Sequence, residues 1–83
     1  MTVLYFAWVK DKIGKSSETF ALPGDVTTVG ELAGWLAQQS AAHASAFAEP
    51  RLVRAAVNQD HADSDHPVAD GDEVAFFPPV TGG

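Results

Sequence analysis

The last six residues of this 83-residue sequence, Pro78-Pro79-Val80-Thr81-Gly82-Gly83, are the part best suited to covalent chemistry. Prolines favour an extended backbone and glycine has no Cβ, so the segment presents a slim, unhindered carboxylate. Six extended residues span about 20 Å, which is enough to reach deep into another protein. A carboxylate becomes an acyl donor only when it carries a good leaving group, such as an adenylate made from ATP. We therefore expect Gly83 to be the residue that reacts.

The sequence has no motif with which it could activate that carboxylate itself. It contains neither the phosphate loop G-x-x-x-x-G-K-[ST] nor the dinucleotide motif G-x-G-x-x-G. We expect a separate ATP-using enzyme to activate Gly83. The alternative is an idle, frayed terminus.

Histidine and acidic residues elsewhere do not form a convincing catalytic or metal motif. His61, Asp63, Asp65 and His66 lie close together in the sequence. Counted from Asp63, however, valines stand where a calcium loop requires Gly and Glu. His43 lies in an alanine-rich segment without an acid or a nucleophile at a suggestive spacing. The sequence predicts no metal site and no catalytic triad.

Composition and charge limit the kind of partner. There is no cysteine, which excludes disulfides and thiolate chemistry and favours the cytoplasm. The N-terminus shows neither a signal peptide nor a membrane span. The net charge of −6 disfavours nucleic acid. Acidic residues concentrate in 60–73, whereas Lys10, Lys12 and Lys15 lie near the N-terminus; the acidic segment either attracts a basic partner or only keeps the protein soluble.

The first half of the sequence predicts a hairpin followed by a helix. Residues 3–10 and 16–22 are rich in strand-forming types, and Asp11-Lys12-Ile13-Gly14 between them is typical of a turn. Thr28 and Glu31 have the spacing of a capping box at a helix start. The apolar stripe of this helix consists of Val29, Leu32, Ala33 and Leu36.

The second half predicts a short helix and two strands. An alanine-rich helical segment extends to about Ala48 and is ended by Pro50. Residues 52–58 form a strand, an irregular stretch follows, and Asp70-Gly71 is a turn before the last strand, 73–77. The prediction is an α+β, β-grasp (ubiquitin-like) domain over residues 1–77. Its mixed sheet carries one main helix on one face, and residues 78–83 form an extended tail.

One face of this sheet is left uncovered by the helix. Because side chains alternate in strands, Leu4, Phe6, Trp8 and Phe77 should share the outer face. Four such residues in water indicate a partner interface. The alternative is a set of scattered surface aromatics.

Several segments are similar to a known family. Residues 55–59 (AAVNQ), 65–67 (DHP) and the whole stretch 70–83 (DGDEVAFFPPVTGG) resemble the small subunit of molybdopterin synthase, as does the opening strand. The resemblance implies a β-grasp sulfur carrier in which Gly83 is adenylated by an E1-like enzyme using ATP and Mg, with Gly82 as its required neighbour. A sulfur-donor protein then supplies the sulfur of a thiocarboxylate.

The resemblance also implies the acceptor and the partners. The tail, Pro78 to Gly83, inserts into the synthase large subunit in a heterotetramer and gives its sulfur to cyclic pyranopterin monophosphate, which builds the molybdopterin dithiolene. The catalytic side chains belong to the large subunit, so the chain is part of an enzyme only as its sulfur-donating subunit. Phe6 and Phe77 match interface positions. His61 stands where relatives can have a larger apolar residue, at the edge of the interface.

Three alternatives remain open. A related carrier could serve thiamine synthesis or tRNA thiolation, although the run Phe76 to Thr81 favours molybdopterin. A protein-conjugated tag would join Gly83 to lysines. In a plain interaction module, the tail would be idle.

Overall fold

The computed structural model describes residues 1–79, and these residues contain one mixed five-stranded sheet. The strands are β1 (Thr2–Tyr5), β2 (Ser17–Thr19), β3 (Arg54–Val57), β4 (Asp60–Ala62) and β5 (Glu73–Phe77), in the order β2-β1-β5-β3-β4. β1 and β5 are parallel, and the other pairs are antiparallel. This is the α+β, β-grasp arrangement that the sequence predicts, with the last strand at the centre of the sheet.

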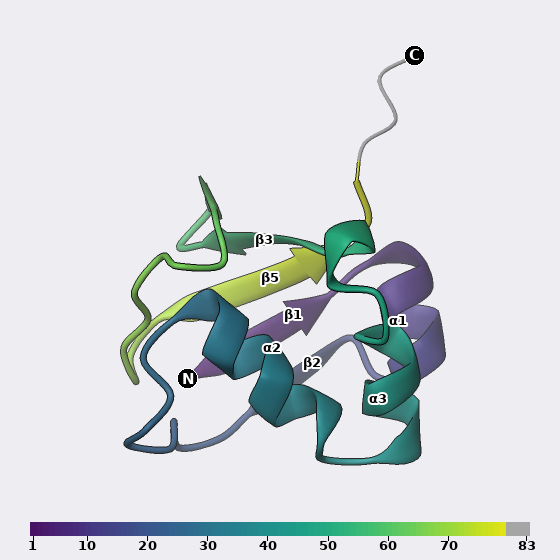
Figure 1. Cartoon of the computed structure of the whole chain (residues 1–83), viewed down its shortest axis with the longest axis horizontal. Coiled ribbons are helices and arrows are strands. Elements are labelled where there is room, and N and C mark those ends of the chain that lie inside the picture. The colour runs from purple at the N-terminus through teal and green to yellow at the C-terminus, as the bar shows by residue number, and fades with distance from the viewer. Residues whose placement is uncertain (80–83) are drawn as a thin grey trace.

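Three α-helices, rather than one main helix, accompany the sheet. α2 (Val29–Ala37) lies across one face, while α1 (Ala7–Ile13) and α3 (Ala41–Ala46) pack together at the end where β1 and β5 finish (Figure 1). A short 3-10 helix, η1 (Pro50–Leu52), precedes β3. The core lies between α2 and the sheet, where Val3, Tyr5, Leu32, Val74 and Phe76 are at most 1% exposed. None of the helices in residues 1–79 is long and apolar enough to span a membrane.

The predicted strand over residues 3–10 is wrong beyond Tyr5. The chain leaves the sheet at Ala7, where φ is 53°, and continues as α1. Val9 and Ile13 are buried one helical turn apart, while the residues between them are exposed, which is the helical period. The predicted turn at Asp11–Gly14 is the last turn of this helix. Gly14 ends it with φ 85°, donating its N–H to the carbonyl of Lys10.

The predicted start of α2 is confirmed, but the capping box is only half formed. The Thr28 hydroxyl accepts from the Glu31 N–H at 3.2 Å. The Glu31 carboxylate, however, accepts from the N–H and hydroxyl of Thr27, both at 2.8 Å, instead of from Thr28. Val29, Leu32 and Leu36 are buried, as their stripe predicts.

The stretch between β3 and β5 contains a strand that the sequence reading missed. β4 pairs with β3 through a two-residue turn, Asn58-Gln59, in which both φ values are positive, 50° and 73°. Such turns match strand twist and favour Asn, but Gln rarely adopts this conformation, so the signal is weak. The Asp70-Gly71 turn before β5 is confirmed.

The remaining boundaries differ because caps and prolines define them. β2 is three residues long instead of 16–22. α3 ends at Ala46 instead of near Ala48, and its N-terminus is capped by Ser40. β3 begins at Arg54, because η1 takes up Pro50 to Leu52.

Candidate functional site

The tail leaves the sheet at the end of its central strand. β5 ends at Phe77, and Pro78-Pro79 follow, which lack the N–H groups needed to continue pairing. Both prolines are half-buried, so the start of the tail lies against the domain. The other predicted tail residues, Val80, Thr81, Gly82 and Gly83, lie outside the described residues.

The uncovered side of the sheet carries an apolar surface beside this point. We call it the docking face and define it as Leu4, Phe6, Ala56, His61, Ala75 and Phe77. Strand register places them on one side, because Leu4 pairs with Ala75, which pairs with Ala56, which pairs with His61. Phe6 is 48% exposed, whereas Leu4 and Phe77 are half-buried. The placement of Leu4, Phe6 and Phe77 agrees with the predicted outer face.

His61 and Phe77 form one edge of the docking face. Their rings meet edge to face with centroids 5.7 Å apart. Arg54, the Cα partner of Phe77 in β3, lines a hollow with both rings. The two rings hold each other in place, so His61 extends the aromatic surface across the outermost strand.

Trp8 is not on the docking face. It lies on α1, is partly buried against the core, and has the Lys12 ammonium 5.8 Å from its ring centroid. The prediction failed because strand alternation was continued past Tyr5 into a helix, where successive side chains turn by about 100°.

A polar cluster that is largely buried joins β1, β2 and α3, and the spacing of its residues in the sequence does not predict it. The Glu18 carboxylate accepts from the Tyr5 hydroxyl at 2.6 Å and contacts His43 Nε2 at 2.7 Å. His43 Nδ1 lies 2.7 Å from the Ser40 hydroxyl, and Lys15 reaches Glu18 from outside at 3.2 Å. Because a carboxylate only accepts, Nε2 carries the proton.

The cluster contains a serine, a histidine and a glutamate, but its geometry is that of a structural network. His43 is 6% exposed, so a substrate cannot reach its ring. The Ser40 hydroxyl also accepts from the His43 N–H at 3.1 Å, as the N-cap of α3. The sequence spacing suggested neither an acid nor a hydroxyl near His43, but the fold brings Glu18 and Ser40 beside its ring.

Hydrogen bonding sets the charge state of this cluster. Burial acts to raise the pKa of Glu18, but hydrogen bonds from His43, Tyr5 and Lys15 outweigh it and lower that pKa to about 2. Burial, with the neighbouring Glu18 carboxylate, raises the pKa of the Tyr5 hydroxyl far above its usual range. Glu18 is therefore an anion, and Tyr5 a neutral donor, throughout the neutral range.

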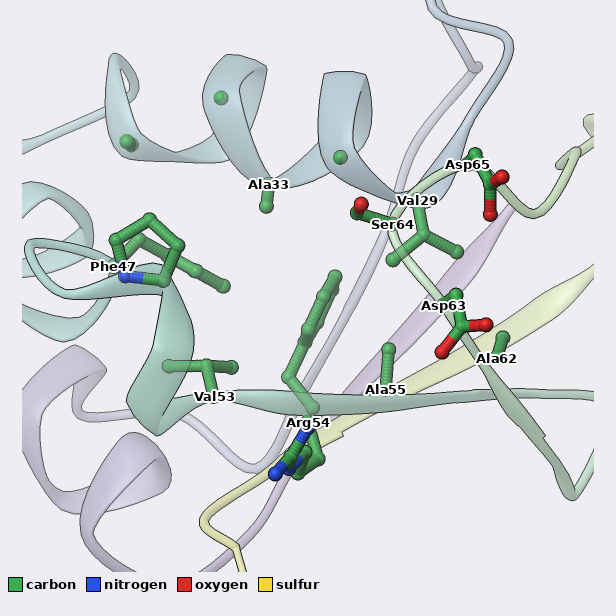
Figure 2. Close-up of a pocket in the computed structure, with 15 residues that line it drawn as sticks. Val29, Ala33, Phe47, Val53, Arg54, Ala55, Ala62, Asp63, Ser64 and Asp65 are labelled. Atoms are coloured by element: carbon green, nitrogen blue, oxygen red, sulfur yellow. The ribbon is translucent and has the colours of Figure 1, made fainter.

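An apolar groove of about 690 Å³ runs between α2 and β3 (Figure 2). α2 lines it with Val29 and with four small residues, Gly30, Ala33, Gly34 and Ala37. Figure 2 shows Ala33 pointing from α2 toward the cavity, opposite Val53 and Ala55. Asp63 and Asp65 lie in the loop at one end. The apolar walls suit contact with apolar groups better than acid–base chemistry.

The acidic residues near β5 brace loops. Asp70 accepts from the Leu22 N–H at 2.8 Å, and Asp72 accepts from the Ala69 N–H at 2.9 Å and from Asn58 at 3.0 Å. These bonds lower the pKa of both carboxyl groups. Over residues 1–79, His, Asp and Glu side chains do not gather in threes that could hold a metal ion.

Known proteins share both the sequence and the fold. The ThiS family matches residues 3–83. A "Molybdopterin synthase sulfur carrier subunit" of Escherichia coli (strain K12) is 48% identical, with 98% of this chain and 96% of the relative covered. The protein of the same name from Haemophilus influenzae (strain ATCC 51907 / DSM 11121 / KW20 / Rd) is 37% identical, with 100% and 99% covered.

The solved structures include another kind of carrier. The H. volcanii small archaeal modifier protein 1 has a TM-score of 0.73 and 29% identity, with 96% of this chain and 97% of that chain covered. The chain belongs to the ThiS family, among relatives named as sulfur carrier subunits of molybdopterin synthase.

Proposed function

We propose that this protein is the sulfur carrier subunit of a molybdopterin synthase and acts in the cytoplasm. The observation that carries the proposal is the 48% identity to such a subunit over nearly the whole of both chains. The structure adds a tail that starts beside an exposed aromatic face, which suits a subunit that docks and inserts its end. The relatives' name implies a synthase large subunit as the partner. Residues 1–77 form the docking domain and 78–83 the inserted tail.

In this proposal Gly83 carries the chemistry. An E1-like enzyme with ATP and Mg joins the Gly83 carboxylate to AMP and releases pyrophosphate. Sulfur from a donor protein displaces AMP, which leaves a thiocarboxylate. The large subunit binds the docking face, receives Pro78 to Gly83, and supplies the side chains that transfer the sulfur to cyclic pyranopterin monophosphate. Water then cleaves the bond between the Gly83 carbonyl carbon and the transferred sulfur, which leaves the sulfur on the pterin and returns Gly83 to a carboxylate. This chain binds neither ATP nor metal in the proposal.

Intact-mass spectrometry tests the carrier step. The protein is incubated with an E1-like enzyme, ATP and a sulfur source, and the mass should rise by the difference between sulfur and oxygen. The matched control lacks Gly82 and Gly83 and should fold normally, because both lie beyond the strands and helices of the domain. An unchanged mass with every cognate enzyme would contradict the proposal.

The structural neighbour named a modifier protein supports one alternative, in which Gly83 is joined to lysines of other proteins. The test is to search cell extracts for adducts that end in the Gly82-Gly83 remnant. Adducts that disappear when these two glycines are deleted would favour a tag. The relatives' names favour molybdopterin over thiamine or tRNA thiolation.

A further inference from the structure

A second apolar point lies outside the docking face. Among residues 1–79, the large hydrophobic side chains that are substantially exposed are Phe6, at 48%, and Leu52, at 43%. Phe6 belongs to the docking face, but Leu52 does not. η1 holds Leu52 in place, because its N–H donates to the Glu49 carbonyl at 2.9 Å and the Val53 N–H donates to Pro50 at 3.1 Å. An exposed leucine on an ordered turn is poised for contact.

A hollow of about 240 Å³ lies beside Leu52, with Trp8 and the methyl groups of Ala46 and Ala48 among its walls. The indole of Trp8 is partly buried, and the Lys12 ammonium lies 5.8 Å from its centroid. Lys12 in turn donates to the Ser45 hydroxyl at 3.4 Å. The hollow therefore has a fixed aromatic wall and room for an apolar group.

Residues of α1 and η1 line the hollow, and both elements are next in the sequence to residues at or beside the docking face. Trp8 follows Phe6 by two residues, and Leu52 precedes Arg54 by two. Arg54 is the Cα partner of Phe77, the last residue before the tail. Figure 1 shows η1 and α1 at the end of the sheet from which the tail leaves. Leu52 therefore lies at the end of the sheet where the tail begins (Figure 1).

The charge around this point is opposite to that of the whole molecule. Four of the five Lys and Arg residues lie on α1, η1 and the start of β3: Lys10, Lys12, Arg51 and Arg54. They outnumber the two acidic residues there, Asp11 and Glu49, the second of which lines the hollow and lies 4.0 Å from Arg51. The net charge of the chain is −6, and the acidic segment 60–73 lies largely in the loops before β5. Carboxylates on a partner would be attracted to this end.

We propose that Leu52 and Trp8 form a second contact point for the protein that accepts the tail, and that they take an apolar side chain flanked by carboxylates. The inference rests on the proposed function. It assigns part of the interface to α1 and η1, away from the sheet, and it states the chemistry of the partner surface there.

Binding to the purified cognate large subunit tests the contact. Leu52→Ala should raise the dissociation constant about fivefold, and Leu52→Asp more than tenfold, since the new charge is desolvated next to carboxylates. Thermal unfolding should barely change, because Leu52 is exposed. Phe77→Ala is the comparison variant on the docking face.

The results separate the inference from the proposed function. If Leu52→Asp binds like the wild type while Phe77→Ala binds weakly, the second contact does not exist and the docking face stands. If the wild type itself does not bind the large subunit, both proposals fail.

Variants that change one charge test whether the partner surface at this point carries carboxylates. Arg51→Gln and Gln38→Glu each lower the net charge by one, but Gln38 lies at the end of α2. Arg51→Gln should slow association several-fold at low salt, an effect that high salt removes, and Gln38→Glu should not. Equal association rates for the two variants would overturn the acidic character assigned to the partner.

Discussion

Glu18 ties together three elements of the domain through one side chain. It lies on β2, and its carboxylate binds Tyr5 of β1, His43 of α3 and Lys15. β2 is short and mostly exposed, and these bonds add to its pairing with β1. A partly buried, charge-assisted network is costly to leave unpaired.

Replacing Glu18 with Gln should make the free energy of unfolding less dependent on pH between about 4.5 and 2. The folded-state pKa of Glu18, about 2, lies below its usual 4.5. The carboxylate therefore stabilises the fold above pH 4.5, and this contribution is lost as pH falls toward 2. At neutral pH, Glu18→Gln should cost about 1–3 kcal/mol. Urea unfolding at several pH values measures the difference between the two proteins.

A loss of wild-type stability at low pH does not by itself identify Glu18 as the cause, because hydrogen bonds also lower the pKa of Glu31, Asp70 and Asp72. The informative quantity is the stability gap between wild type and variant, which should narrow from pH 4.5 to 2. A gap that stays constant would show that the charge of Glu18 does not matter.

At the scale of elements, α2 contains two glycines in different surroundings. A Cβ on Gly34 would meet no heavy atom within 4 Å, whereas one on Gly30 would lie 3.1 Å from the Ser64 carbonyl oxygen. The Gly30 N–H also donates to that oxygen at 2.7 Å. Gly34 therefore has room for a larger side chain, whereas Gly30 contacts the Ser64 loop closely.

These two positions form a matched pair. Gly34→Ala should stabilise the protein by about 0.5–1 kcal/mol, the usual gain in a helix interior. Gly30→Ala gains the same propensity but must push the Ser64 loop away, so it should be neutral or destabilising. Chemical denaturation of both variants checks this. Equal stabilisation at both positions would mean that the Ser64 loop yields freely.

The elements also show what the sequence could and could not predict. The stripe of α2, the strand β5 and the proline stop after it depend on local patterns, and all are confirmed. α1 was missed because the apolar run from Val3 to Val9 continues across the boundary between strand and helix. β4 was missed because its turn uses Gln59 at positive φ. The Glu18 cluster joins residues up to 25 apart, a contact that only the tertiary fold creates.

At the scale of the whole molecule, the sheet separates stability from recognition. Phe76 faces the core and is 1% exposed, while its neighbour Phe77 lies on the docking face. The sequence predicted this alternation, whereas the role of the tail stays a prediction, because residues 80–83 lie outside the described part of the chain. It could not place Leu52 beside Trp8, since that contact depends on η1 and α1.

Alanine substitution of these two neighbours should therefore change different properties, folding stability for Phe76 and partner binding for Phe77. Phe76→Ala should lower the free energy of unfolding by about 3–5 kcal/mol. This is a large share of the total folding stability of a domain of this size. Phe77→Ala should leave thermal unfolding nearly unchanged and weaken binding to the large subunit by about 1–3 kcal/mol. Calorimetry of folding and of binding measures both. Unfolding caused by Phe77→Ala would show that the two faces are assigned the wrong way round.

The central position of β5 has a mechanical consequence. The tail continues from a strand that is hydrogen-bonded on both sides, to β1 in parallel and to β3 in antiparallel register. Tension on the tail acts along β5, across the direction of these bonds, so many of them share the load instead of opening one at a time. A protein that pulled on the tail would therefore load the hydrogen bonds of β5 to both β1 and β3. The tail therefore begins at a strand where two sets of inter-strand hydrogen bonds resist such a pull together.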